Sequence, residues 1–266
     1  MRAMISMYDM PERRPTIGAW WEGLARHWRA AGLRDVPHSA HMPDSDLYDL
    51  WLAPDLFIAQ TCGFPLTHRL KDRVTLVATP VYAVDGCAGG RYHSVIVARQ
   101  DSDVRSLDDV AGKVAAFNGH DSQSGWNALR HSLIGKGAPA RLLESGGHRK
   151  SVAAVREGRA DVAAIDCVTY AGLQQFAPEE IAPLRIIARS ASAPALPFVT
   201  RRDIAPADLE KLRAGLRAAM ADAALAETRT AMQLAGIEIV PLQAYDRLLE
   251  IEQEADRAGS LVVDRA

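Results

Sequence analysis

Small hydroxylated residues lie between an apolar run and a helical pattern near the middle of the chain. Residues 114–117 read as a buried strand, and a helix is predicted from Ser124 to Leu133. The first turn of a helix has unpaired backbone N–H groups and the positive end of the helix dipole, so it stabilises an anion. Serine hydroxyls add hydrogen-bond donors, and a glycine allows a ligand to approach the backbone closely. We therefore predict an oxyanion site at Ser122, Gln123, Ser124 and Gly125.

The alternative for this turn is that Asp121 or Ser122 only caps the helix, as such residues commonly do. Further polar residues also follow predicted strands, where open α/β sheets bind their ligands. They are Gln60, Thr61 and Cys62 after residues 55–59, His148 after residues 141–143, and Asp166 after residues 160–165.

Each of these segments also has a purely structural reading. The first is a tight turn that needs Gly63, His148 is an ordinary capping or surface residue, and Asp166 caps the next helix. Tyr8, after the first predicted strand, would offer a ring and a hydroxyl donor to a ligand, or it simply packs in the core. Trp20, Trp21, Leu24 and Trp28 recur at helical spacing, which predicts a core-facing stripe.

Strand-like and helix-like segments alternate along the chain, which predicts an α/β protein with mostly parallel sheets flanked by helices. The predicted strands are 3–8, 55–60, 74–79, 94–98, 114–117, 141–143, 160–165 and 184–188. The predicted helices are 16–30, 45–52, 124–133, 151–157, 169–176, 206–222, 226–234 and 244–258.

Glycine-rich and proline-bearing stretches divide the chain into two predicted lobes. One stretch, residues 85–91, precedes a strand, and the other covers residues 190–198. We expect residues 1–93 with 196–266 in the first lobe and 94–195 in an inserted second lobe, joined by a two-strand hinge. A small ligand would bind in the cleft of such a protein.

Composition narrows the possible partners. The 266 residues are 48% hydrophobic and 24% charged, with a formal net charge of −2, so there is no basic footprint for nucleic acid. No apolar run is long enough to insert in a membrane. The apolar stretch at the N-terminus is shorter than a secretory signal requires. We therefore expect a cytoplasmic protein as the sequence stands, or a periplasmic one if an export signal has been removed.

The three cysteines have neither CxxC nor CxxH spacing, so we expect no metal site and no cofactor. Cys62 and Cys87 both lie in glycine-containing turns and could pair in an oxidising compartment. The dinucleotide, Walker, HExxH and GxSxG motifs are absent. A thiol site made of Cys62, His148 and Asp166 has only the residue types in its favour. We therefore expect a binding protein without catalytic residues.

Several segments in one order resemble the phosphate, phosphite and phosphonate substrate-binding proteins of ABC transporters. They are Met7–Pro11, Gln60–Leu66, Gly86–Tyr92, Ser106–Gly112, Ser122–Gly125, Gly146–His148 and Ala163–Cys167. The resemblance implies a bilobal type II periplasmic-binding-protein fold, a small anionic ligand such as a phosphonate or phosphate ester, and an ABC permease as a candidate partner.

The resemblance also assigns roles to the candidate residues. Residues 122–125 would grip the oxyanion with help from His148, Asp166 would face the variable group of the ligand, and Tyr8 and residues 60–63 would contribute from the first lobe. The sequence departs from the family in two respects: it shows no export signal and no arginine beside the serine turn. The alternative is a cytoplasmic enzyme or a ligand sensor with the same bilobal fold.

Overall fold

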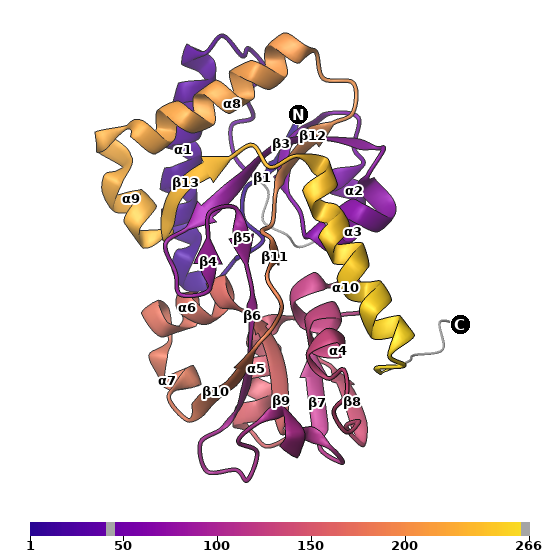
Figure 1. The fold of residues 1–266 in the computed structure, drawn as a ribbon. Coiled ribbons are helices and arrows are strands. Elements are labelled where there is room, and N and C mark those ends of the chain that lie inside the picture. The colour runs from indigo at the N-terminus through magenta and orange to yellow at the C-terminus, as the bar shows by residue number, and fades with distance from the viewer. Residues whose placement is uncertain (41–45, 262–266) are drawn as a thin grey trace. The chain divides into compact units, whose positions relative to one another are not determined.

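The computed structural model describes residues 1–40 and 46–261, which form two compact units (Figure 1). Unit 1 contains Met1–Ala83, Ala88–Gly90 and Pro194–Ala244. Unit 2 contains Val84–Cys87, Arg91–Ala193 and the residues from Tyr245 onward. The chain therefore passes from one unit to the other within residues 83–91, at residues 193–194 and at residues 244–245.

Unit 1 is built on a sheet with the strand order β1-β2-β12-β3-β13. Strand β1 is parallel to β2, whereas β12 is antiparallel to both β2 and β3, and β13 is antiparallel to β3. The strands are β1 (Arg2–Met4), β2 (Leu56–Gln60), β3 (Val74–Tyr82), β12 (Phe198–Arg201) and β13 (Leu234–Glu238).

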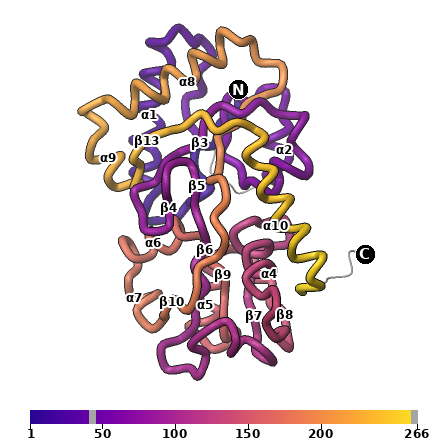
Figure 2. Tube along the Cα trace, in the orientation of Figure 1, coloured from indigo at the N-terminus to yellow at the C-terminus, as the bar shows by residue number. Residues whose placement is uncertain are grey.

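The helices of unit 1 come from both ends of the chain. They are η1 (Pro11–Arg13), α1 (Arg14–Ala30), α2 (Leu47–Trp51), α3 (Gly63–Pro65), η2 (Leu66–Leu70), α8 (Pro206–Ala221), η5 (Ala223–Leu225) and α9 (Ala226–Ala231). The short helix η6 (Leu242–Tyr245) ends at the last passage between the units. Although they are far apart in the sequence, α1 and α8 lie side by side, as the indigo and orange tubes of Figure 2 show.

The tryptophan stripe of α1 forms the core of unit 1, as its spacing predicted. Trp20, Trp21, Leu24 and Trp28 are all buried. The indole N–H of Trp28 donates to the carbonyl of Leu212 at 2.9 Å, which joins α1 to α8. Burying large aromatic side chains with their polar atoms paired stabilises this helix pair.

Unit 2 has a sheet with the order β10-β6-β9-β7-β8. Its strands are β6 (Ser94–Arg99), β7 (Val114–Phe117), β8 (Arg141–Glu144), β9 (Val162–Asp166) and β10 (Leu184–Arg189). Its helices are η3 (Leu107–Val110), η4 (Gln123–Asn127), α4 (Ala128–Ser132), α5 (His148–Arg156), α6 (Cys167–Phe176), α7 (Pro178–Ile181) and α10 (Asp246–Arg257). Three short strands, β4 (Cys87–Ala88), β5 (Arg91–Tyr92) and β11 (Ala193–Pro194), form a third sheet.

The prediction of mostly parallel sheets is wrong, because both large sheets are mixed. In unit 2, β7 pairs in parallel with β8 and β9, but β6 pairs in antiparallel fashion with β9 and β10. A parallel pair requires a crossover connection within the sheet. The chain enters β6 and β12 shortly after it crosses from the other unit. No crossover connection within their own unit precedes these strands, so they need not run parallel to their neighbours.

The C-terminal segment from Tyr245 belongs to unit 2, whereas residues 196–266 were expected together in the first lobe. Helix α10 packs against η4 and α4, which Figure 1 shows in yellow and pink. It buries Leu248, Ile251 and Ala255, and the carbonyl of Leu248 accepts a hydrogen bond from Asn127 at 3.1 Å. The chain therefore has a third passage between the units, at residues 244–245, in addition to the expected two.

Several predicted helices have different bounds, and two of them, both in unit 1, differ as follows. The helix expected over residues 226–234 ends at Ala231, and β13 starts at Leu234. Gln233 between them has a φ of 56°, a left-handed conformation that ends a helix. The helix expected from Ser45 is α2, which starts at Leu47, and Ser45 itself lies outside the described residues.

Candidate functional site

The serine turn of unit 2 starts a helix, as predicted, but one residue earlier and in a different form. Ser122 is the N-cap, and its hydroxyl oxygen accepts a hydrogen bond from the backbone N–H of Gly125 at 3.0 Å. The first turn, η4, is π-helical, with the N–H of Asn127 donating to the carbonyl of Ser122 at 3.0 Å. The capping interpretation therefore holds for Ser122. A hydroxyl that accepts one hydrogen bond can still donate another, so capping leaves its donor available.

Ser124 and His148 lie together, although they are far apart in the sequence. The Oγ atom of Ser124 is 2.8 Å from Nε2 of His148. The two residues follow β7 and β8, which are parallel neighbours with Phe117 opposite Glu144 at their ends. Because parallel strands end at the same edge of a sheet, the turns that follow them meet there. Helix α5 starts at His148 rather than at the predicted Ser151, and this puts the imidazole in its first turn.

His148 is a neutral imidazole near pH 7. Burial lowers its pKa from 6.5 to about 4, and the backbone of Ala164 opposes that shift. The Nδ1 atom is buried without a hydrogen bond of normal geometry, whereas Nε2 is engaged with Ser124. The serine turn thus has a neutral donor or acceptor beside it instead of a cation.

Gly125 is required by packing at this position. A Cβ atom added to Gly125 would lie 2.8 Å from Cγ of Asn118 and 3.1 Å from the backbone nitrogen of the same residue. The space expected for a ligand beside this glycine is occupied, on the Cβ side, by Asn118. Sequence reasoning missed Asn118. The available signal was its place directly after β7, at the carboxyl end of a strand.

Gln123 supports the turn from inside unit 2. Its side-chain oxygen accepts a hydrogen bond from Nδ2 of Asn127 at 2.7 Å, and the same Nδ2 atom donates to the carbonyl of Leu248. Both side chains are buried. The amide oxygen of Gln123 is therefore committed to the contact between η4 and α10, and a role of Gln123 in ligand binding stays a prediction.

Asp166 caps α6, which was one of its two predicted roles. Its Oδ1 atom accepts hydrogen bonds from the backbone N–H groups of Val168 at 2.8 Å and Thr169 at 3.4 Å. The residue is only 1% exposed. That Asp166 also faces a ligand stays a prediction.

The predicted residues of unit 1 lie around the carboxyl end of β2. Gln60 is fully buried, and its Oε1 atom accepts from the backbone N–H of Met7 at 2.9 Å. Its Nε2 atom donates to the hydroxyl of Tyr82 and to the carbonyl of Leu196, both at 3.2 Å. Three hydrogen bonds thus hold the Gln60 side chain within unit 1. They use both N–H groups of its amide, so contact of Gln60 with a ligand stays a prediction.

The other three predicted residues of this unit are buried as well. The ring of Tyr8 packs edge-on against Tyr82, with centroids 5.3 Å apart, and the hydroxyl of Thr61 donates to the carbonyl of Cys62 at 3.2 Å. Cys62 is the residue before α3. Contacts of Tyr8, Thr61 and Cys62 with a ligand stay predictions.

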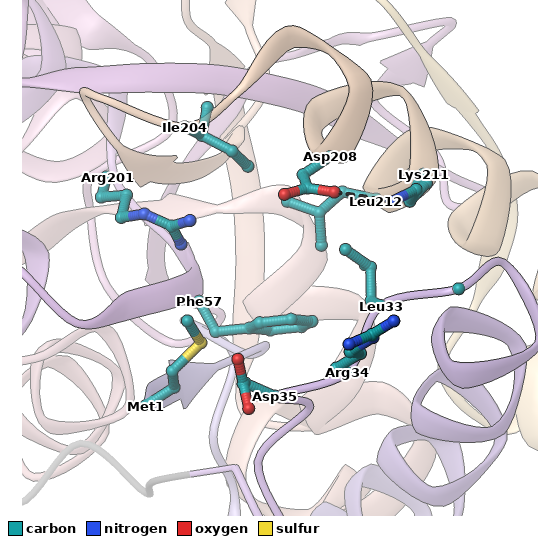
Figure 3. Close-up of a pocket in the computed structure, with 11 residues that line it drawn as sticks. Met1, Leu33, Arg34, Asp35, Phe57, Arg201, Ile204, Asp208, Lys211 and Leu212 are labelled. Carbon is teal, nitrogen blue, oxygen red and sulfur yellow. Dashed lines mark hydrogen bonds and ion pairs between the residues drawn. The ribbon is translucent and has the colours of Figure 1, made fainter.

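A cavity of about 390 Å³ lies elsewhere in unit 1 (Figure 3). Gln60 ends β2, whereas the cavity lies near the start of that strand. The cavity lining includes Met1, which precedes β1, Phe57, the second residue of β2, and Arg201, the last residue of the antiparallel β12. Figure 3 shows the Asp208 carboxylate beside Lys211 at its rim, where the two form an ion pair of 2.8 Å. None of the predicted site residues lines this cavity, so we do not assign the oxyanion site to it.

Within residues 1–40 and 46–261, no group of three or more His, Cys, Asp or Glu side chains is arranged to hold a metal ion. In the same part of the chain, no helix combines the length and the apolar character that a membrane span requires.

Comparison with known proteins identifies the family. Residues 55–245 match the family described as "ABC transporter, phosphonate, periplasmic substrate-binding protein", and this match spans more than half of the chain. The chain belongs to this family. Its members are substrate-binding proteins, which supports the expectation that the chain binds a solute.

One curated relative of the chain is the phosphonates-binding periplasmic protein of Escherichia coli (strain K12). It is 27% identical over 138 residues, which cover 49% of the chain and 40% of the relative. The match thus spans less than half the length of that relative.

Two solved structures show the same type II periplasmic-binding-protein fold. One is a binding protein component of an ABC phosphonate transporter from Pseudomonas aeruginosa, with a TM-score of 0.78 and 18% identity, covering 97% of the chain and 87% of that protein. The other is a Prochlorococcus marinus (MIT 9301) protein in complex with methylphosphonate, with a TM-score of 0.74 and 12% identity, covering 96% of the chain and 98% of that protein. At these identities the likeness concerns the fold, and it confirms the fold expected from the sequence.

Proposed function

We propose that this member of the phosphonate-binding family captures a small phosphonate or phosphate-ester oxyanion at the serine turn of unit 2. The observation that carries the proposal is the 2.8 Å contact between Ser124 Oγ and His148 Nε2, at the start of η4. Membership of a phosphonate substrate-binding family supports the choice of ligand class.

The contact gives the anion a relay of donors. With the imidazole proton on Nε2, His148 donates to Ser124 Oγ, and the hydroxyl proton of Ser124 points to the ligand oxygen. The hydroxyl of Ser122 and the first amides of η4 add further donors at the positive end of the helix. Hydrogen bonds to a charged oxygen are roughly twice as strong as those between neutral groups.

No cation is needed in this arrangement. Arg130 and Arg149, the arginines closest in sequence to Ser124 and His148, form ion pairs with Asp256 and Glu180. The proposal therefore assigns neither arginine to the oxyanion and relies on neutral donors, so the affinity should depend only weakly on salt concentration.

We further propose that an ABC permease accepts the bound ligand from this protein, because the matching family consists of ABC transporter components. Deleting the gene in its source organism should abolish growth on a phosphonate as the only phosphorus source. Normal growth and uptake in the deletion strain would contradict the transport role and leave the binding proposal standing.

Titration calorimetry with methylphosphonate, inorganic phosphate, sulfate and acetate tests the binding proposal. We expect binding of at least one phosphorus oxyanion, and a loss of about 10-fold or more in affinity in Ser124→Ala, because a hydrogen bond to a charged group contributes about 1.5–3 kcal/mol.

Ser132→Ala is the matched control. Ser132 ends α4, and its hydroxyl is buried with no hydrogen-bond partner, so its removal should leave the affinity unchanged. The proposal fails if none of the four anions binds, or if Ser124→Ala binds as tightly as the unmodified protein.

A further inference from the structure

Two of the three cysteines lie side by side in unit 2. The sulfur atoms of Cys87 and Cys167 are 3.6 Å apart, and all three cysteines are free thiols. The glycine-containing turns around Cys62 and Cys87 had suggested a bond between these two residues. Cys62 is in unit 1, at the start of α3, and the sulfur that Cys87 contacts is that of Cys167. A disulfide requires sulfurs about 2 Å apart, so a small side-chain movement would suffice to join Cys87 and Cys167.

The backbone around the pair holds both cysteines in place. Gly86 has a φ of 102°, a left-handed conformation that favours glycine, and a Cβ atom added there would lie 2.9 Å from Cβ of Cys167. The turn that carries Cys87 can therefore pack directly on Cys167 only because residue 86 lacks a side chain. The backbone of His93 connects the two cysteine segments. Its N–H donates to the carbonyl of Gly86 at 3.1 Å, and its carbonyl accepts from the backbone N–H of Cys167 at 3.3 Å.

The two thiols differ in their access to reagents. Cys87 is half-buried, whereas Cys167, the first residue of α6, is only 2% exposed. The hydrogen bond with Cys87, followed by burial, raises the pKa of the Cys167 thiol. A dissolved oxidant therefore meets Cys87 first.

Charged groups surround the pair. Arg189 forms a two-fold ion pair with Asp85, with distances of 3.0 and 2.6 Å, and its Nη1 atom lies 3.3 Å from Nε2 of His93. The hydrogen bond to Asp85, followed by the charge of that carboxylate, raises the pKa of Arg189.

We propose that Cys87 and Cys167 are a redox-active pair that forms a reversible disulfide with a low-molecular-weight disulfide as the oxidant. The Cys87 thiolate attacks one sulfur of the oxidant and releases one thiolate, which gives a mixed disulfide. The Cys167 thiolate then attacks the Cys87 sulfur and releases the second thiolate. Two protein thiols are oxidised, the oxidant is reduced to two thiols, and each released thiolate takes up one of the protons that the cysteines lose.

The bond would link two positions of structural importance. Cys87 is the last residue of unit 2 before the chain passes to unit 1 at Ala88, and Cys167 follows the candidate ligand residue Asp166 at the start of α6. The two cysteines are 80 residues apart in the chain, so the bond would restrict the unfolded chain considerably.

Incubation of the reduced full-length protein with glutathione disulfide, followed by thiol alkylation and peptide mapping, tests the proposal. We expect two thiols to become protected from alkylation, a peptide pair that joins Cys87 to Cys167, and a free Cys62. The melting temperature should rise by about 5 °C or more and return on reduction with dithiothreitol.

Three variants sharpen the test. Cys62→Ser should behave like the unmodified protein, and Cys87→Ser should lose both the protection and the shift in melting temperature. Cys167→Ser should accumulate a stable glutathione adduct on Cys87, because the resolving thiol is absent. The proposal is overturned if all three thiols of the unmodified protein stay open to alkylation, if the bond involves Cys62, or if the unmodified protein keeps the adduct on Cys87.

Discussion

The buried imidazole of His148 makes the stability of unit 2 depend on pH. Its pKa is 6.5 in an unfolded chain and about 4 in the folded protein. Between these values the unfolded state binds the proton and the folded state does not. Stability is therefore fully present above pH 6.5 and is lost as the pH falls towards 4.

The magnitude follows from the shift. A difference of about 2.5 pH units corresponds to at most about 3.4 kcal/mol, at about 1.36 kcal/mol for each unit. His148 as a whole residue is half-buried, so solvent reduces this value, and we expect about 2 kcal/mol. His148→Gln keeps a hydrogen-bonding group near Ser124 but cannot titrate, so it should lose about 2 kcal/mol less than the unmodified protein between pH 7 and pH 4.

Urea denaturation at several pH values measures the effect. Each denatured sample is then labelled by a short pulse of hydrogen–deuterium exchange, always at the same pH. The exchange of peptides from β9 reports the unfolding of unit 2 alone. His93 also has a lowered pKa, from burial and from the nearby Arg189, but it is present in both proteins and cancels in the comparison. His120→Gln, at an exposed histidine, is the control for the substitution itself. If the unmodified protein and His148→Gln lose stability in parallel over this range, the reasoning about the buried imidazole is refuted.

Three further predictions concern packing. Gly125→Ala should destabilise unit 2 by about 1–3 kcal/mol in urea denaturation, because the added methyl group meets Asn118; unchanged stability would contradict the contact. Gly215→Ala should cost unit 1 a similar amount, since its Cβ would lie 2.8 Å from Nε1 of the buried Trp28, and an unaltered tryptophan emission spectrum would count against this. Arg130→Met removes a hydrogen bond of 3.1 Å to the carbonyl of Ser260 and the ion pair with Asp256. It should destabilise unit 2 by about 1–3 kcal/mol and speed up hydrogen exchange in α10. Equal exchange in α10 would contradict the role of Arg130 in holding this helix.

The local elements of this protein could be predicted because their signals lie within short segments. The tryptophan spacing of α1 indicates a buried stripe, and the apolar run before the serines indicates β7. Ser122 and Asp166 cap helices because each stands directly before one, and this position can be read from the sequence. The collinear motifs likewise led to the family and to the fold.

Long-range pairings could not be predicted in the same way. The amphipathic pattern of α10 shows that one face is buried, but it does not show that this face packs on η4 and α4 of unit 2. The direction of β6 and β12 depends on where the chain enters each unit, and hydrophobic pattern carries no information on strand direction.

The sequence by itself determined where most helices lie to within a few residues, which faces are apolar, and which family the chain resembles, because these properties depend on neighbours within a few positions. Only the tertiary structure decided that Ser124 meets His148, that Asn118 occupies the space beside Gly125, and that Cys87 faces Cys167. These pairs are 24, 7 and 80 positions apart in the chain. The physical reason is that strand order and chain path bring them together, and both are properties of the packed protein rather than of any local segment.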